Sequence, residues 1–87
     1  QTEFIVKLGE KQPIKYIELA ETISEGQKVE SFKIYSKNDD NLWNFEEHGT
    51  TIGSRKIVVL DNVTTDEIKV LITSARDTVK LDWIKVY

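Results

Sequence analysis

The side chains that could do chemistry gather in three turn-like segments. Glu25, His48 and Arg76 are the main candidates, because a carboxylate, an imidazole and a guanidinium can together accept from and donate to sugar hydroxyls. These residues belong to three expected connections, at residues 21–28, 48–54 and 74–78. If successive strands run antiparallel, alternate connections lie at the same end of the fold, so these three segments would meet. A carbohydrate-binding site at that end is therefore one interpretation, and the favoured alternatives are a surface turn at His48 and an ion pair of Arg76 with Asp77 or a glutamate.

Acidic residues gather in the connections expected at the opposite end. They are Asp39, Asp40, Asp61 and Asp66, whose hard carboxylate oxygens could attract calcium. Their spacing matches no ligand loop, however, and an Asp39–Asp40 pair suits a solvated turn. The chain has one His and no Cys, so it lacks the ligand set of a typical zinc site. We predict no metal site and no cofactor, with calcium as the open alternative.

Trp43 has two interpretations. An exposed indole could stack on the apolar face of a sugar ring, and this would add Trp43 to the carbohydrate site. Phe45 lies two residues further along the same expected strand and therefore points to the same face. Two aromatic residues at this spacing favour burial. The sequence thus favours a core position for Trp43 and keeps sugar contact as the alternative.

Trp83 and Tyr87 are expected on the outside of the last strand. Ile84 and Val86 are the natural inward pair of residues 81–87, which turns Trp83 and Tyr87 outward. An outward Trp and Tyr on a terminal strand suit docking against another domain. A register in which Trp83 is buried is the alternative.

Composition excludes several classes of function. The chain has 87 residues, with 12 Lys and Arg against 15 Asp and Glu and a net charge of −3, which argues against a general nucleic-acid binder. No apolar run approaches the roughly 20 residues needed to cross a bilayer, so membrane insertion is not expected. The carboxylates occupy no recognisable catalytic setting, so we expect no hydrolysis by this chain alone. The sequence begins at Gln1 and contains no Met, and we expect it to be a piece of a longer protein.

Apolar residues recur at every second position along most of the chain, which is typical of β-strands. Strands must therefore position the candidate residues. Phe4, Val6 and Leu8 alternate with polar neighbours, and Phe32 and Ile34 form another inward pair. Turn residues divide the chain into seven short strands at residues 4–8, 14–19, 29–36, 42–46, 56–60, 68–73 and 81–87. This spacing predicts an all-β antiparallel sandwich or barrel, folded as a single domain over residues 1–87.

Four segments together resemble a known family. They are ELAETISEGQKVESF at residues 18–32, Trp43, HGTTIGSRKI at 48–57 and ITSARDTVKLDWIKVY at 72–87. In order and spacing they resemble the C-terminal β-sandwich module of α-L-fucosidases of glycoside hydrolase family 29. That module falls within the galactose-binding-like and discoidin jelly rolls. The resemblance implies a jelly roll of seven or eight strands and a secreted, periplasmic or extracellular location.

The resemblance also implies a function. We expect a non-catalytic accessory domain that packs against and supports the catalytic barrel of an α-L-fucosidase-like enzyme, its main partner. One alternative is a carbohydrate-binding module that recognises galactose- or fucose-containing glycans through the loops at one end. A second alternative is a discoidin-like adhesion or protein-binding domain.

Overall fold

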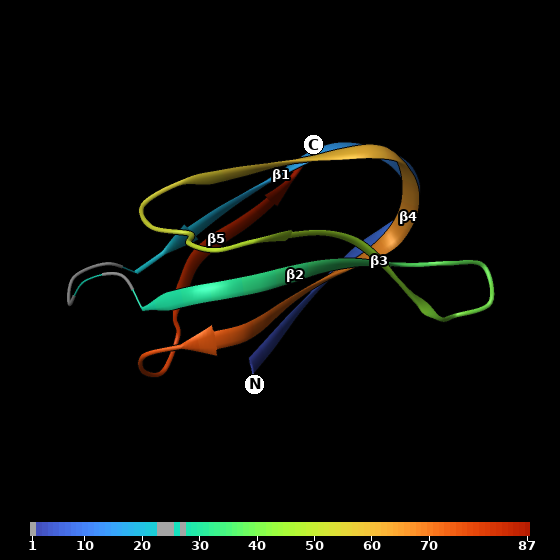
Figure 1. Cartoon of the computed structure of the whole chain (residues 1–87). Coiled ribbons are helices and arrows are strands. Elements are labelled where there is room, and N and C mark those ends of the chain that lie inside the picture. The colour runs from blue at the N-terminus through green and yellow to red at the C-terminus, as the bar shows by residue number, and fades with distance from the viewer. Residues whose placement is uncertain (1, 23–25, 27) are drawn as a thin grey trace.

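The residues that the structure describes form a single antiparallel sheet of five strands. The computed structural model describes residues 2–22, 26 and 28–87. The strands are β1 (Thr2–Glu21), β2 (Val29–Lys37), β3 (Trp43–Gly49), β4 (Lys56–Ala75) and β5 (Leu81–Val86). Their order in the sheet is β3-β2-β4-β1-β5 (Figure 1). The all-β antiparallel prediction is therefore confirmed, whereas the predicted seven or eight strands are five. Within the described residues, no helix is long and apolar enough to cross a membrane.

The strand count differs because two predicted turns lie inside long strands. Residues 9–13 and 61–66 belong to the 20-residue strands β1 and β4, where Gln12 pairs with Thr65 and Pro13 with Thr64. The β1–β4 register shifts on both sides of this pairing. Such irregularities bend strands without ending them. Turn-forming residues here mark a bend in two continuous strands.

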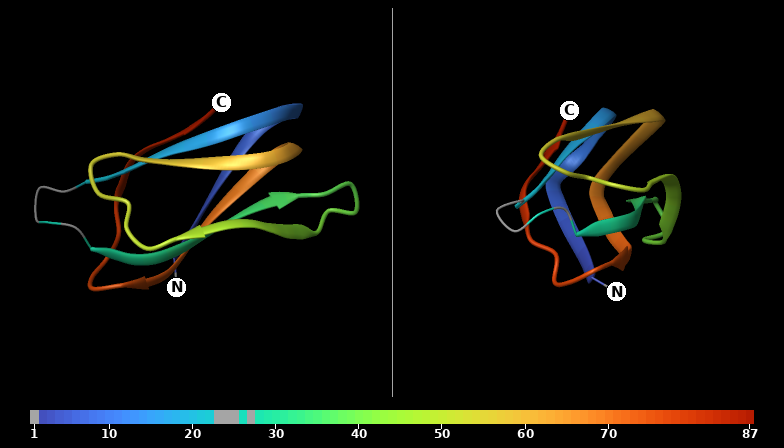
Figure 2. Two further views of the ribbon diagram at one scale, coloured as in Figure 1. Left: turned by 45° about the horizontal axis from the view of Figure 1, so that its top comes forward. Right: turned by 60° about the vertical axis from the view of Figure 1, so that its left-hand side comes forward.

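This shared bend folds the sheet over, so that its two halves face each other across the core (Figure 2). One half contains β3, β2, the second half of β4 and the first half of β1; the other contains the first half of β4, the second half of β1, and β5. Phe32 and Ile34 are fully buried, as their alternation predicted. Both halves contribute to one hydrophobic cluster that includes Ile17, Leu19, Val58, Leu60, Ile68, Val70 and Ile72.

The predicted grouping of the connections is correct. The end of β1, the start of β2, and the β3–β4 and β4–β5 connections lie at one end of the molecule, and the β2–β3 turn lies at the other with the two bends (Figure 1). Backbone bonds join the residues next to the end of β1 and the start of β2 to the β4–β5 connection: Thr22 N–H donates to the Lys80 carbonyl at 2.9 Å, and Arg76 N–H donates to the Lys28 carbonyl at 2.9 Å. We call this end the loop end.

A buried carboxylate holds the loop end together. One oxygen of Glu21 accepts hydrogen bonds from the amides of Lys28 and Val29, at 2.8 and 3.1 Å. The other accepts from the amide of Gly53 at 3.1 Å, and the Glu21 amide donates to the Gly53 carbonyl at 2.8 Å. Buried amides of loops need partners as much as those of strands do, and Glu21 supplies them from the last position of β1.

The first prediction concerns this carboxylate. Glu21→Gln should lower the free energy of unfolding by roughly 2–3 kcal/mol, because a neutral amide accepts less strongly than a carboxylate and turns an NH₂ group toward a backbone donor. Urea denaturation of the 87-residue chain measures this change. Glu10→Gln, at an exposed position of the bend, is the control and should change stability by less than about 0.5 kcal/mol. Equal stabilities of the two variants would contradict the role of Glu21.

A second prediction concerns Gly49, the last residue of β3. A Cβ atom built there would lie 2.5 Å from Cζ of the buried Phe32 ring. Gly49→Ala should therefore cost about 1–3 kcal/mol of stability through overpacking. The double variant Gly49→Ala, Phe32→Leu should lose less stability than the sum of the losses in the two single variants, because a smaller side chain at position 32 makes room for the new methyl group. Strictly additive losses in urea denaturation would be inconsistent with this steric explanation.

Candidate functional site

The residues predicted for the loop-end carbohydrate site do not all meet. Arg76 lies there, exposed, in the β4–β5 connection, and its amide is bonded to the Lys28 carbonyl. His48 lies within β3, where it pairs with Lys33. Lys33 is five residues from Lys28 along the chain, which corresponds to about 16 Å of extended strand. The structure therefore separates His48 from Arg76, and Glu25 lies outside the described residues.

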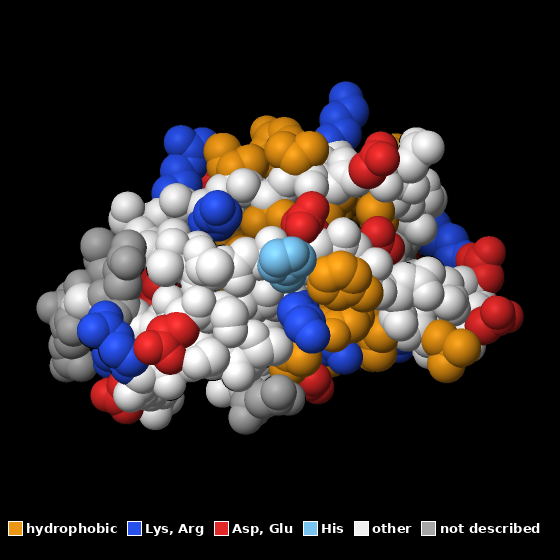
Figure 3. All heavy atoms as spheres, in the orientation of Figure 1, with side chains coloured by type: hydrophobic (Ala, Val, Ile, Leu, Met, Phe, Trp, Pro, Cys, Tyr) orange, Lys and Arg blue, Asp and Glu red, His pale blue; other side chains and the backbone are white. Residues whose placement is uncertain are grey.

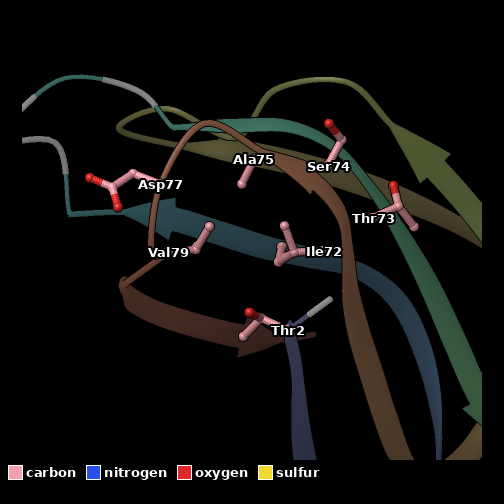
Figure 4. Close-up of a pocket in the computed structure, with 7 residues that line it drawn as sticks. All are labelled: Thr2, Ile72, Thr73, Ser74, Ala75, Asp77 and Val79. Carbon is pink, nitrogen blue, oxygen red and sulfur yellow. The ribbon is translucent and has the colours of Figure 1, made fainter.

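A hollow of about 390 Å³ lies at the loop end. Figure 4 shows it between the end of β4, the β4–β5 connection and the start of β1. The residues around it are Thr2, Ile72, Thr73, Ser74, Ala75, Asp77 and Val79. Retaining hydrolysis of a glycoside needs two carboxylates about 5 Å apart, and these residues supply only Asp77. This hollow can offer hydroxyls and one acceptor to a ligand, which is a binding chemistry.

One of the four acidic residues at the opposite end has a basic partner among the described residues. Asp39 forms an ion pair with Lys11 across the bend. The β2–β3 turn is closed by the Asn38 side-chain oxygen, which accepts from the amides of Asp40 and Leu42 at 2.9 and 3.0 Å. In the part of the chain that the structure describes, no group of three or more His, Asp or Glu side chains is placed to hold a metal ion. The prediction of no cofactor and its alternative, calcium, stay untested.

Trp43 is not in the core, and the preference for burial was wrong. The register pairs Trp43 with Lys37 and Phe45 with Tyr35, on the face of β2 opposite the buried Phe32 and Ile34. The other face of β3 carries polar residues, since Asn44 pairs with the buried Ser36 and Glu46 accepts a hydrogen bond from its hydroxyl. As the edge strand of the sheet, β3 turns its aromatic residues outward.

These outward residues form what we call the aromatic–lysine face. It consists of Lys33, Tyr35, Lys37, Trp43, Phe45, His48 and Lys69. The Phe45 ring lies nearly parallel to the His48 ring, with centroids 6.3 Å apart, and meets Tyr35 edge-on at 5.9 Å. Figure 3 shows the histidine beside hydrophobic and basic side chains on this side of the molecule. Sequence reasoning chose His48 and Trp43 but missed Phe45.

A second exposed cluster covers the outside of the other half of the sheet. Ile57 and Val59 on β4 and Trp83 and Tyr87 at the C-terminal end are exposed, Val59 by 71% and Trp83 by 37%. Tyr87 stacks on Tyr16 with ring centroids 4.7 Å apart. We call these residues the apolar outer face. The expected outward orientation of Trp83 and Tyr87 is observed, with Ile84 and Val86 packed against the core.

A polar network anchors this face. The Glu18 carboxylate accepts hydrogen bonds from Nε of Arg55 and from Nε1 of Trp83, each at 2.8 Å. The hydrogen bond from Arg55 holds the pKa of Glu18 below its usual range; desolvation acts against it, and Trp83 and Lys85 reinforce it. Sequence reasoning did not select Glu18, because strand alternation turns a residue between the inward Ile17 and Leu19 toward the outside, where a carboxylate is ordinarily solvated.

Comparison with solved structures identifies the class of protein that has this fold. A candidate α-L-fucosidase from Bacteroides thetaiotaomicron superposes with a TM-score of 0.93 at 19% identity, over 98% of this chain and 20% of that protein. A candidate α-L-fucosidase from Bacteroides ovatus gives 0.91 at 29% identity, over 99% of this chain and 15% of that protein. A chitosan-binding module of a Paenibacillus chitosanase/glucanase gives 0.81 at 18% identity, over 98% of this chain and 68% of that one.

The fold is thus that of a small all-β part of carbohydrate-active proteins. More particularly, the chain resembles a part of α-L-fucosidases of glycoside hydrolase family 29, as the sequence predicted. It spans only 15–20% of the length of the fucosidases named here. No family model matches the chain, and no curated protein matches it.

The third prediction follows from the lowered pKa of Glu18. Its stabilising effect should be complete above the unfolded-state pKa of about 4.3 and should disappear as the pH falls through the lower folded-state value. Glu18→Gln should therefore be less stable than the parent chain at pH 7, and the difference should shrink toward pH 2. Urea denaturation across this range measures it. Arg55→Gln should also be less stable than the parent chain at pH 7, and its stability difference should shrink over the same pH range. A loss of stability that does not depend on pH in both variants would contradict this account.

Proposed function

We propose that the chain is a non-catalytic accessory domain of an α-L-fucosidase-like glycoside hydrolase. The observation that carries this proposal is the superposition of practically the whole chain on a small fraction of family 29 enzymes, at up to 29% identity. The remaining four fifths of such an enzyme would contain the catalytic domain. The C-terminal position within the parent protein and export from the cytoplasm are part of this proposal, and both rest on the family resemblance.

The apolar outer face suits the docking of that catalytic domain. Its exposed groups are contiguous, because Val59 pairs with Tyr16 and Ile57 with Glu18 in adjacent strands, and Trp83 pairs with Ala20. Protein interfaces favour aromatic residues at their centre and charges at their rim. Arg55 and Lys85 supply such charges here, both beside Glu18. The hydrogen bond from Trp83 to Glu18 fixes the indole before docking, which reduces the entropy lost on binding.

Carbohydrate binding is the second candidate function. Its support is the likeness in fold to a chitosan-binding module, together with the hollow and Arg76 at the loop end. Titration calorimetry of the 87-residue chain with fucosylated and galactosylated oligosaccharides tests it. Binding that is lost in Arg76→Ala would support a loop-end site. No detectable binding to any of these oligosaccharides would exclude a binding module specific for galactose or fucose.

The accessory role also predicts what surrounds the chain. The reading frame that contains this chain should encode a catalytic domain of a few hundred residues. The longer protein should hydrolyse 4-nitrophenyl α-L-fucoside, and the 87-residue chain should not. A reading frame without a catalytic domain would contradict the accessory role and favour the third candidate, an adhesion or protein-binding domain.

The fourth prediction tests the docking face within the longer protein. Val59→Lys should lower its melting temperature and expose the domain junction to protease, because a lysine replaces an apolar contact in the interface. The same change in the isolated 87-residue chain should shift stability by less than about 0.5 kcal/mol, since Val59 is exposed there. Ile5→Lys is the matched control, because Ile5 is 48% exposed on the other half of the sheet. A longer protein sensitive to Ile5→Lys and indifferent to Val59→Lys would place the interface elsewhere.

A further inference from the structure

The aromatic–lysine face has a regular construction. Three outward pairs cross from β3 to β2: His48 with Lys33, Phe45 with Tyr35, and Trp43 with Lys37. On the next strand Lys69 pairs with Tyr35. Basic and aromatic side chains thus alternate along β2, and the aromatic rings and the imidazole of β3 lie beside them. The apolar outer face lies on the other half of the folded sheet, so the two faces are separate surfaces.

Lysine side chains cover two aromatic rings of this face and leave the ring of Phe45 open to a ligand. Nζ of Lys69 lies 4.8 Å from the ring centroids of both Tyr35 and Trp43, and its side chain is only 14% exposed. Nζ of Lys37 lies 4.8 Å from the Trp43 centroid and 3.1 Å from a carboxylate oxygen of Glu67. These ammonium groups occupy the places over Trp43 and Tyr35 where a ligand would stack. Phe45, by contrast, is 53% exposed.

The charge next to Phe45 is positive. Lys33 is exposed beside His48, and among the described residues no carboxylate forms an ion pair with Lys33. Of the two neighbouring carboxylates on β3, Glu46 accepts a hydrogen bond from Ser36 on the inner side of the strand. Glu47 pairs with the buried Ile34 and accepts a hydrogen bond from the amide of His48 at 3.0 Å. An available ammonium group, a neighbouring imidazole and a flat apolar ring therefore lie together on a chain whose net charge is −3.

We propose that the aromatic–lysine face binds an acidic glycan. The apolar face of one sugar ring stacks on Phe45, and the carboxylate or sulfate of the same or the next sugar pairs with Lys33 and accepts a hydrogen bond from His48. Single-stranded nucleic acid fits less well, because such sites stack successive bases on several open rings, and here the lysines cover two of the rings. This site is distinct from the loop end and does not depend on the identity of the parent enzyme.

The experiment is an amide-resolved NMR titration of the 87-residue chain with a hexamer of galacturonate. The neutral hexamer of galactose and a thymidine hexanucleotide are the comparison ligands. Shift changes should map to β2 and β3, and binding of the acidic hexamer should weaken as salt is raised, because charges at a surface are screened. The neutral hexamer should bind at least about threefold more weakly.

Two variants and two controls make the test specific. Phe45→Val keeps a residue suited to a strand and should weaken binding about tenfold, the amount expected for loss of one aromatic contact. Lys33→Gln should weaken binding about threefold and reduce its salt dependence. Ile57→Ala and Lys85→Gln, on the other half of the sheet, should change nothing.

Four outcomes would overturn the proposal. They are no shift with the acidic hexamer, shifts confined to residues 76–80, equal affinity for the neutral hexamer, and tighter binding of the oligonucleotide. Shifts on β2 and β3 that depend on protein concentration alone would show a second copy of the chain to be the occupant. Amide spectra of each variant without ligand verify that it is folded.

Discussion

The arrangement of the loop end depends on one buried carboxylate. Glu21 ends β1, and its two oxygens bind the amides that begin β2 and that precede β4. The backbone of the β4–β5 connection is then joined to the same region through Lys28 and Thr22. The chain contains no cysteine, so its connections are held by hydrogen bonds and packing without disulfides. Here three of them are tied to Glu21, the last residue of β1, and to Thr22, which follows it.

Glu18 and Glu21 show how one strand can serve two purposes. Both are buried carboxylates near the C-terminal end of β1, and they point to opposite sides of the strand. Glu21 organises backbone amides inside the loop end, whereas Glu18 holds the Arg55 and Trp83 side chains on the apolar outer face. The internal stability of the domain and the rigidity of its docking surface therefore come from neighbouring positions of the same strand. This proximity would let the domain present a pre-ordered surface to the enzyme that contains it.

Strand alternation made much of the fold predictable, and its limits are equally physical. The buried positions of Phe32 and Ile34 and the outward Trp83 follow from a period of two. Gly9–Pro13 carries the composition of a turn, and composition does not distinguish a bend in a paired strand from the end of one. Trp43 could not be placed because its strand lies at the edge, where the inner side need not be apolar. His48 is separated from Arg76 because β3 continues to Gly49, beyond the predicted end of its strand, so that His48 lies within the strand and not in a loop.

The long bent strands also determine when the domain can form. Apart from the β2–β3 hairpin, each pairing joins distant parts of the chain: Thr2 meets Ile72, and Ile17 meets Val86. On a ribosome β1 emerges first and remains without its partners until almost the whole domain has been made. Contacts so distant in sequence make folding slow. The apolar residues of β1 therefore stay exposed for most of synthesis, and a cell that makes this domain has to keep them from aggregating until its last strand appears.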